Sequence, residues 1–296
     1  MTHYSIVIPT FGRNKFLKDC LKSVEQQLEK PQEVFIIDNN TLLADQKSVE
    51  SIVMGFSNSE ISFNYRKGII NSGAAARNYG ATLVSTEIVA FLDDDVILEN
   101  NYYDEIVKVF KSDDDIVGVQ GLDTSFRDSY ILNVKNKFMG TFWSTIESFF
   151  EHASIVRLKD SRLRPSLAVC HPTPDQVFTV ESQWISTCAG AFKKEIFSVI
   201  EFSNQFVKYS WNEYVFFSHS IFQKNLGKMI YTSEAKYRNI PTDDGRMPIT
   251  ELVYMAEVYD LYIFCTLLAF ELSAFLFLKF GKQLINALLL KLNCKQ

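Results

Sequence analysis

The chain lacks the cysteine pattern of a disulfide-stabilised or zinc-binding protein. Its 296 residues include five cysteines, an odd number, and no two of them form a Cys-x-x-Cys pair. A disulfide framework or a structural zinc site is usually built on paired or closely spaced cysteines. We therefore expect buried free thiols in a reducing compartment. The cysteines are Cys20, Cys170, Cys188, Cys265 and Cys294.

Positive charge is also scarce. The net charge is −5, and no stripe of Lys and Arg interleaved with aromatic residues is present, which argues against nucleic acid as a partner. Apolar residues make up 47% of the chain, enough for a substantial core. Because the chain enters an expected strand at Tyr4, we expect no signal peptide and a cytoplasmic protein.

Strands and helices alternate up to about residue 122. This alternation predicts an α/β fold with a mostly parallel central sheet flanked by helices. After residue 122 the pattern loosens into aromatic-rich segments. The expected strands are 5–8, 33–37, 61–65, 88–92 and 116–120, and the expected helices are 15–28, 44–54, 73–83 and 103–111.

We divide the chain into residues 1–122, residues 123–250 as the second half of the same domain, and an apolar, basic helical tail, 251–296. Within the tail, 261–278 is apolar except for Glu271, Thr266 and Ser273, and would be about 27 Å long as a helix. Glu271 would be costly inside a bilayer, and the lysines that follow favour the cytoplasmic side. We expect the tail to lie on the inner face of the cell membrane; a core or oligomer helix and a true span remain alternatives.

Three consecutive carboxylates follow the apolar run Ile88–Leu92. Asp93, Asp94 and Asp95 would then lie at the C-terminal edge of the sheet, where open α/β sheets bind ligands. A divalent ion with a diphosphate would relieve their mutual repulsion. The simpler interpretation is a solvated acidic turn. A second triplet, 113–115, follows a helix and precedes a strand, so we expect it in a loop. We expect Asp95 at an exposed strand end.

Three further segments should reach the same edge. The first strand ends in Pro9, Thr10 and Arg13, and the second ends in Asp38, an acceptor for a base N–H group. The third segment, 71–80, opens a helix with Gly and Ala, so that a ligand could approach its backbone closely. Each signal is weak alone, but their order and spacing together indicate a nucleotide site.

These segments resemble the family 2 glycosyltransferases of GT-A fold, which use nucleotide sugars. The motifs are SIVIPTFGRNKFLKDCLKSV, EVFIIDNN, GAAARNYGA and VAFLDDDV, over about residues 4–120. The resemblance implies that Asp38 holds the nucleobase and that Arg77 borders the nucleotide. It implies that Asp93 and Asp94 face the ribose and sugar. It assigns Asp95 to a divalent metal, Mn²⁺ or Mg²⁺, on the diphosphate of the donor, with a UDP-sugar favoured. Pro9, Thr10 and Arg13 would complete the nucleotide-sugar site.

The second half matches the family more loosely, through STCAGAFKKEIF, WNEYVFFSHSI and YTSEAKYRNIPTDDGR. Glu213 keeps the family's Glu, but Tyr214 stands where the resemblance implies the catalytic Asp. A tyrosine titrates near 10 and cannot replace a carboxylate base at neutral pH. Three interpretations stay open. Glu213 is the base; another acid (Asp175, Asp243 or Asp244) is the base; or the protein is weak or inactive.

The resemblance implies an inverting glycosyltransferase that passes a sugar to a polysaccharide or lipid-linked acceptor in surface-glycan biosynthesis. The alternative is an inactive homologue that serves as a partner subunit. A sugar-nucleotide pyrophosphorylase is disfavoured, because its first loop is Gly-rich whereas PTFGRNK holds one glycine.

Overall fold

The computed structural model describes residues 3–125, 177–240 and 248–267. The first part contains β1 (Tyr4–Thr10), α1 (Asn14–Glu25), β2 (Glu33–Asp38), α2 (Leu43–Met54), β3 (Ser62–Lys67), α3 (Gly73–Leu83), β4 (Ile88–Phe91), β5 (Val96–Leu98), α4 (Tyr102–Ser112) and β6 (Ile116–Asp123). The rest contains β7 (Thr179–Ser182), β8 (Ala191–Lys193), the 3-10 helix η2 (Lys194–Ser198), α7 (Glu213–Gln223), β9 (Lys228–Asn239) and α8 (Ile249–Leu267).

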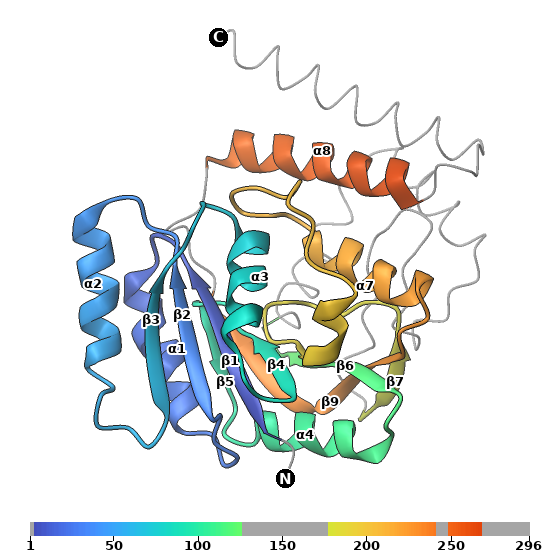
Figure 1. Ribbon diagram of the computed structural model, residues 1–296, viewed down its shortest axis with the longest axis horizontal. Coiled ribbons are helices and arrows are strands. Elements are labelled where there is room, and N and C mark those ends of the chain that lie inside the picture. The colour runs from blue at the N-terminus through green and yellow to red at the C-terminus, as the bar shows by residue number, and fades with distance from the viewer. Residues whose placement is uncertain (1–2, 126–176, 241–247, 268–296) are drawn as a thin grey trace, which may run out of the picture.

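One sheet runs through the molecule in the order β3-β2-β1-β4-β8-β6-β9-β5, and β7 pairs with β9 (Figure 1). The strands β3, β2, β1 and β4 are parallel, as expected from the β-α alternation. Beyond β4 the sheet is mixed: β8 is antiparallel to both of its neighbours, whereas β6 and β9 are parallel. The predicted α/β sheet with flanking helices is confirmed, and its parallel part is the N-terminal half.

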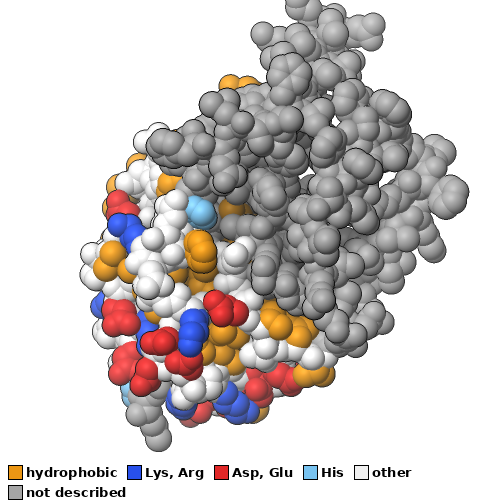
Figure 2. Space-filling model, turned by 90° about the vertical axis from the view of Figure 1, so that its right-hand side faces the viewer, with side chains coloured by type: hydrophobic (Ala, Val, Ile, Leu, Met, Phe, Trp, Pro, Cys, Tyr) orange, Lys and Arg blue, Asp and Glu red, His pale blue; other side chains and the backbone are white. Residues whose placement is uncertain are grey.

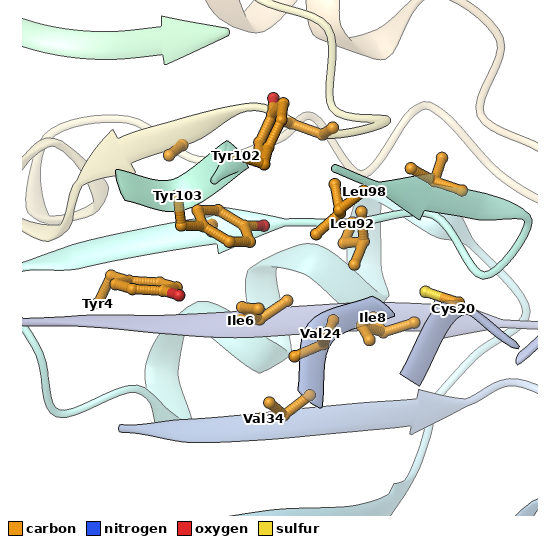
Figure 3. Close-up of a cluster of buried hydrophobic side chains, with 14 of the residues drawn as sticks. Tyr4, Ile6, Ile8, Cys20, Val24, Val34, Leu92, Leu98, Tyr102 and Tyr103 are labelled. Atoms are coloured by element: carbon orange, nitrogen blue, oxygen red, sulfur yellow. The ribbon is translucent and has the colours of Figure 1, made fainter. Parts of the chain in front are cut away.

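Apolar side chains bury both faces of β1. Ile6 and Ile8 point into the cluster beneath α1, whereas Val7 points into the cluster beneath α3. Leu17 and Leu21, one turn apart on α1, are fully buried in the first cluster. Figure 3 shows this cluster, in which the ring of Tyr4 stacks on that of Tyr103 at 4.5 Å. Both faces are covered, so only the strand ends can offer a site.

The second aspartate triplet lies in the loop between α4 and β6, as predicted. There Asp113 forms an ion pair with Lys228 at 2.7 Å, on the surface. Figure 2 shows acidic and basic side chains interspersed on the described part of one face. That part of the face therefore carries no large field of one sign.

Helix α8 packs on the rest of the fold through one face. Met255, Tyr259 and Ile263, spaced four residues apart, are buried in the same cluster as α3 and α7. The start of the segment that we assigned to the tail is therefore part of the core. Within the ranges given above, no helix has the length and apolar character needed to cross a membrane. Residues 268–296, with most of the apolar run, lie outside the described residues.

Candidate active site

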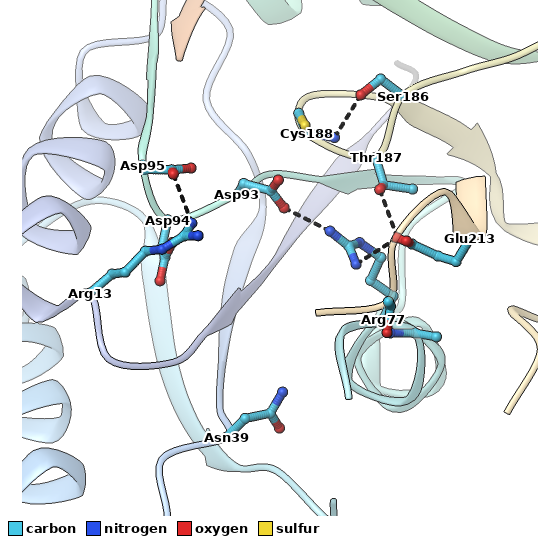
Figure 4. A network of polar contacts seen from close by, with 12 residues as sticks. Arg13, Asn39, Arg77, Asp93, Asp94, Asp95, Ser186, Thr187, Cys188 and Glu213 are labelled. Carbon is cyan, nitrogen blue, oxygen red and sulfur yellow. Dashed lines mark hydrogen bonds and ion pairs between the residues drawn. The ribbon is translucent and has the colours of Figure 1, made fainter. Parts of the chain in front are cut away.

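A cavity of about 500 Å³ opens at the C-terminal ends of the parallel strands. This is the edge at which open α/β sheets bind ligands. The cavity wall combines the segment after β1, the start of α3, the residues after β4 and the start of α7 (Figure 4). Of the residues that the sequence predicts for the site, those on this wall are Pro9, Thr10, Arg13, Arg77, Asp93, Asp94 and Glu213.

Arg13 holds two carboxylates of the first triplet together. Its Nη1 donates to Asp95 Oδ2 at 2.7 Å and to Asp94 Oδ1 at 3.3 Å. Thr10 Oγ1 donates to the other oxygen of Asp94 at 2.6 Å. Burial, and secondarily the neighbouring Asp95, raises the pKa of Asp94 to about 7 although Arg13 and Thr10 oppose this. Asp95 is 4% exposed, so our expectation of an exposed strand end is wrong. It is wrong because Arg13, 82 residues away, neutralises the carboxylate and allows its burial.

Arg77 joins the third carboxylate to α7. Its Nη2 donates to Asp93 Oδ1 at 2.7 Å and its Nη1 to Glu213 Oε1 at 2.9 Å (Figure 4). Thr187 Oγ1 also donates to Glu213 Oε1, at 3.1 Å. Burial alone would lower the pKa of Arg77, but Glu213 and Asp93 raise it above its ordinary value. The guanidinium is therefore a permanent cation between two acids on the cavity wall.

The protonation of Glu213 is set by its burial. The residue is 5% exposed, and burial raises its pKa to about 7, against the attraction of Arg77. A carboxyl group with this pKa can take up and release a proton near neutral pH, which suits a general base. Cys188 also lines the cavity, but burial and then Asp93 raise its thiol pKa well above the ordinary value. Cys188 is therefore a thiol and not a nucleophile.

The donor atoms at the triplet fit a hard divalent cation. Asp94 and Asp95 already converge on one positive atom, Arg13 Nη1. Magnesium and manganese sites that also use substrate phosphates need only one or two protein carboxylates. The described residues contain no cluster of three metal-ligating side chains, so they form no cage that would hold the ion without a phosphate ligand.

Asp38, predicted to hold the nucleobase, is hydrogen-bonded within the protein. Its carboxylate is completely buried and accepts hydrogen bonds from the backbone N–H and side-chain amide of Asn40, at 2.9 and 2.8 Å. Tyr65 OH donates to its other oxygen at 3.0 Å. Asp38 is not on the cavity wall, whereas its neighbour Asn39 is. In this structure Asp38 supports the loop that follows β2, and its assignment to the nucleobase stays a prediction.

The first amides of α3 are hydrogen-bonded within the protein, although Asn71 and Gly73 line the cavity. The side chain of Ser72 accepts from the Ala75 amide at 3.2 Å, and Ser210 Oγ accepts from the Ala74 amide at 3.1 Å. The amide of Gly73 donates to Lys208 O at 3.0 Å. The free amides of a helix start need partners, and here a distant loop supplies them. The small residues of this segment also allow close packing within the protein, since a Cβ on Gly80 would lie 2.2 Å from Val7 Cγ1.

Several wall residues were not predicted from the sequence. Thr187 and Cys188 belong to the STCAGAFKKEIF segment, which matches the family only loosely and gave these two residues no role. Tyr209 comes from the loop before α7, which no motif covers, and Trp211 is the first residue of WNEYVFFSHSI but was given no role. The alternative bases Asp175, Asp243 and Asp244 lie outside the described residues.

A larger hollow of about 1380 Å³ lies elsewhere, along the outer side of α3 and the start of β4. Tyr79, Ile88 and Lys193 are among the residues that line it, and no carboxylate of the first triplet does. It reaches the amino end of β4, whereas the ligands of open sheets bind at the carboxyl ends of the strands. The smaller cavity is therefore the candidate site.

Comparison with known proteins identifies the family of the chain. Residues 5–171, more than half of the chain, match the family model described as Glycosyl transferase family 2. The protein belongs to this family. A 101-residue stretch is 29% identical to the GalNAc(5)-diNAcBac-PP-undecaprenol beta-1,3-glucosyltransferase of Campylobacter jejuni subsp. jejuni, covering 32% of this chain and 30% of that protein.

Two solved structures share the fold. GalNAc-T7 with UDP, GalNAc and Mn²⁺ superposes with a TM-score of 0.59 at 14% identity, over 88% of this chain and 49% of that one. The mannosyltransferase PcManGT of Pyrobaculum calidifontis, in complex with GDP-Man and Mn²⁺, has a TM-score of 0.59 at 13% identity, over 92% of this chain and 65% of that one. The chain thus spans about half to two thirds of these structures. The GT-A fold predicted from the sequence is confirmed.

Proposed function

We propose that the protein is an inverting glycosyltransferase that moves a sugar from a nucleotide-diphosphate sugar to a glycan acceptor. The observation that carries this proposal is the bridge of Arg77 between Asp93 and Glu213. It joins an acid of the donor triplet to a carboxyl group with a pKa near neutrality, on one cavity wall. Asp93, which would bind the donor, and Glu213, which can accept a proton, then lie on either side of the Arg77 guanidinium.

The donor half of the site comprises Pro9, Thr10, Arg13, Asn39 and the aspartate triplet. Asp93 and Asp94 would contact the ribose and sugar, and Asp95 would hold Mn²⁺ or Mg²⁺ against the diphosphate. A bound divalent ion would neutralise charge that develops on the leaving diphosphate. Both solved relatives carry Mn²⁺, which supports this assignment. Because Arg13 Nη1 now bridges Asp94 and Asp95, it would have to yield part of its position to the ion.

The acceptor half is built around Glu213. Its carboxylate would take the proton of an acceptor hydroxyl as that oxygen bonds to the anomeric carbon of the donor. The bond from this carbon to the diphosphate breaks in the same step, and the nucleoside diphosphate leaves. Attack from the side opposite the leaving group inverts the anomeric configuration. Arg77 holds Glu213 in place, and Thr187 fixes the carboxylate oxygen that it shares with Arg77.

The acceptor is proposed to be a polysaccharide or a lipid-linked glycan in surface-glycan assembly, with a UDP-sugar as donor. Support comes from the Campylobacter relative, whose name describes an undecaprenol-linked glycan. We propose that the protein binds peripherally to the inner face of the membrane through its tail. Truncation after Leu267 tests this, because Ile263 belongs to the core and an earlier cut would damage the fold. The full chain should sediment with anionic vesicles and the truncated chain should not.

A screen of nucleotide sugars with Mn²⁺ tests the activity. Release of nucleoside diphosphate that depends on both acceptor and metal supports the enzyme. Binding of nucleotide with no transfer from any donor would instead favour an inactive partner subunit. The Arg77 bridge to Glu213 argues against that alternative, because an unused site would have no need of a buried ion network that is costly to desolvate.

A further inference from the structure

The loop between Phe206 and α7 is strained and firmly anchored. Lys208, Ser210 and Asn212, three alternate residues, have φ values of 54°, 54° and 58°, although none is a glycine. This left-handed conformation is unfavourable for residues with a side chain. Residues held in such conformations cluster at ligand sites, where surrounding contacts impose them.

The contacts that impose this conformation come from both sides of the loop. Towards α3, the amide of Lys208 donates to Asn71 O at 2.9 Å, and Ser210 Oγ accepts from the Ala74 amide. Towards α8, the amide of Val207 donates to Tyr259 OH at 2.7 Å. In Figure 1 the gold loop before α7 passes beneath α8 near the upper end of α3.

The strained backbone presents two aromatic rings to the cavity. Tyr209 and Trp211 both line it, with ring centroids 6.3 Å apart and planes inclined by 30°. Tyr209 is 41% exposed, whereas Trp211 is partly buried and packs against the core cluster beneath α3. Tyr214, also on the cavity wall, packs against Trp184, and their ring centroids are 6.1 Å apart. Glu213 is thus flanked in sequence by aromatic residues that face the same cavity.

We propose that Tyr209 and Trp211 form a platform for one pyranose ring of the acceptor. A pyranose has apolar C–H faces that pack on aromatic rings and hydroxyl groups at its edge that need polar partners. The cavity offers both, since the rings of Tyr209 and Trp211 lie beside carboxylate and amide side chains on its wall. Trp211 lies two residues before Glu213, so a sugar on the platform would bring its edge towards the proposed base. This inference rests on the proposed function and narrows its acceptor to a sugar.

The platform can be tested with methyl glycosides as acceptor fragments. Saturation-transfer NMR of the full chain with UDP and diamagnetic Mg²⁺ should show binding of at least one methyl pyranoside, with the strongest transfer at protons of one ring face. Tyr209→Ala and Trp211→Leu should each weaken this binding about tenfold. Trp211→Phe should retain most of it, because a ring remains. Phe222→Ala is the matched control: this ring is 60% exposed at the far end of α7 and outside the cavity, so binding should not change.

The outcomes separate the platform from the proposed function. UDP affinity should be equal in the wild type and in both ring-deleting variants. If wild type binds UDP but no methyl pyranoside, or if Trp211→Leu binds as well as Trp211→Phe, the platform is wrong while the enzyme assignment stands. A loss of UDP affinity in Tyr209→Ala would assign the rings to the nucleotide and also overturn the platform. Absence of UDP binding in the wild type would overturn both.

Discussion

Replacement of Glu213 by Gln should remove the base with little damage to the site. The amide oxygen of Gln can still accept from Arg77 Nη1 and Thr187 Oγ1, which now lie 2.9 and 3.1 Å from Glu213 Oε1. It cannot accept a proton. General base catalysis contributes about 10²–10⁴ to the rate, so kcat should fall by this factor, equivalent to about 3–5 kcal/mol in the activation barrier.

The assay is the initial rate of nucleoside diphosphate release, measured with saturating donor, acceptor and Mn²⁺. Because burial raises the pKa of Glu213 to about 7, kcat/KM of the wild type should rise with pH to a plateau above this value. In Glu213→Gln this rise of kcat/KM with pH should be absent. Tyr214→Phe is the control, since it keeps the ring that packs on Trp184 and removes only the hydroxyl. It should change kcat far less.

Two results would refute the reasoning. If Glu213→Gln keeps full activity, or if its kcat/KM still rises with pH near 7, another acid is the base. If the variant instead loses donor affinity with kcat unchanged, Glu213 only positions Arg77 for the nucleotide. Titration with UDP, which the account expects to be unchanged within about threefold, distinguishes these cases.

Three further predictions concern stability. Arg77→Met should lower the free energy of unfolding by about 3–5 kcal/mol in urea titrations, because it leaves Glu213 buried without its ion-pair partner; a loss below 1 kcal/mol would contradict this network. The folded state should hold a proton on Glu213 that the unfolded state has released between about pH 5 and 7, so this residue's contribution to stability falls as pH rises through that window. The free energy of unfolding of Glu213→Gln should therefore rise by about 2–3 kcal/mol relative to that of the wild type between pH 5 and 8. A difference between the two proteins that stays constant with pH would be inconsistent with the raised pKa. Ser72→Ala should cost about 1 kcal/mol through loss of the α3 cap, and an unchanged melting temperature would show that this hydrogen bond is not needed.

Local patterns sufficed for the strands and helices up to residue 122, except β5, and for the sheet edge that carries the candidate site. The bounds of α3 were predicted correctly from residues Gly73 to Leu83, and the two aspartate triplets were distinguished by what precedes them. These features depend on strand and helix periodicity, which a single sequence displays.

Contacts between distant segments were not predictable in this way. Asp95 is buried because of Arg13, and the start of α3 is closed by Ser210, which lies 136 residues from Ala74. The burial of Asp38 depends in part on Tyr65, a residue of the neighbouring strand whose hydroxyl donates to its carboxylate. No local pattern records such partners, so the sequence located the site but not the orientation of its side chains.

The most direct test of the account is a crystal structure with UDP and Mn²⁺, with the ion located by its anomalous scattering. The account predicts Mn²⁺ at the carboxylate of Asp95, the diphosphate between the ion and Arg77, and the base of UDP beside Asn39. Asp95→Ala crystals should lose the ion, whereas Asp114→Ala crystals, altered in the surface triplet, should keep it. Nucleotide in the larger hollow along α3, or manganese bound equally well in the Asp95→Ala protein, would contradict it.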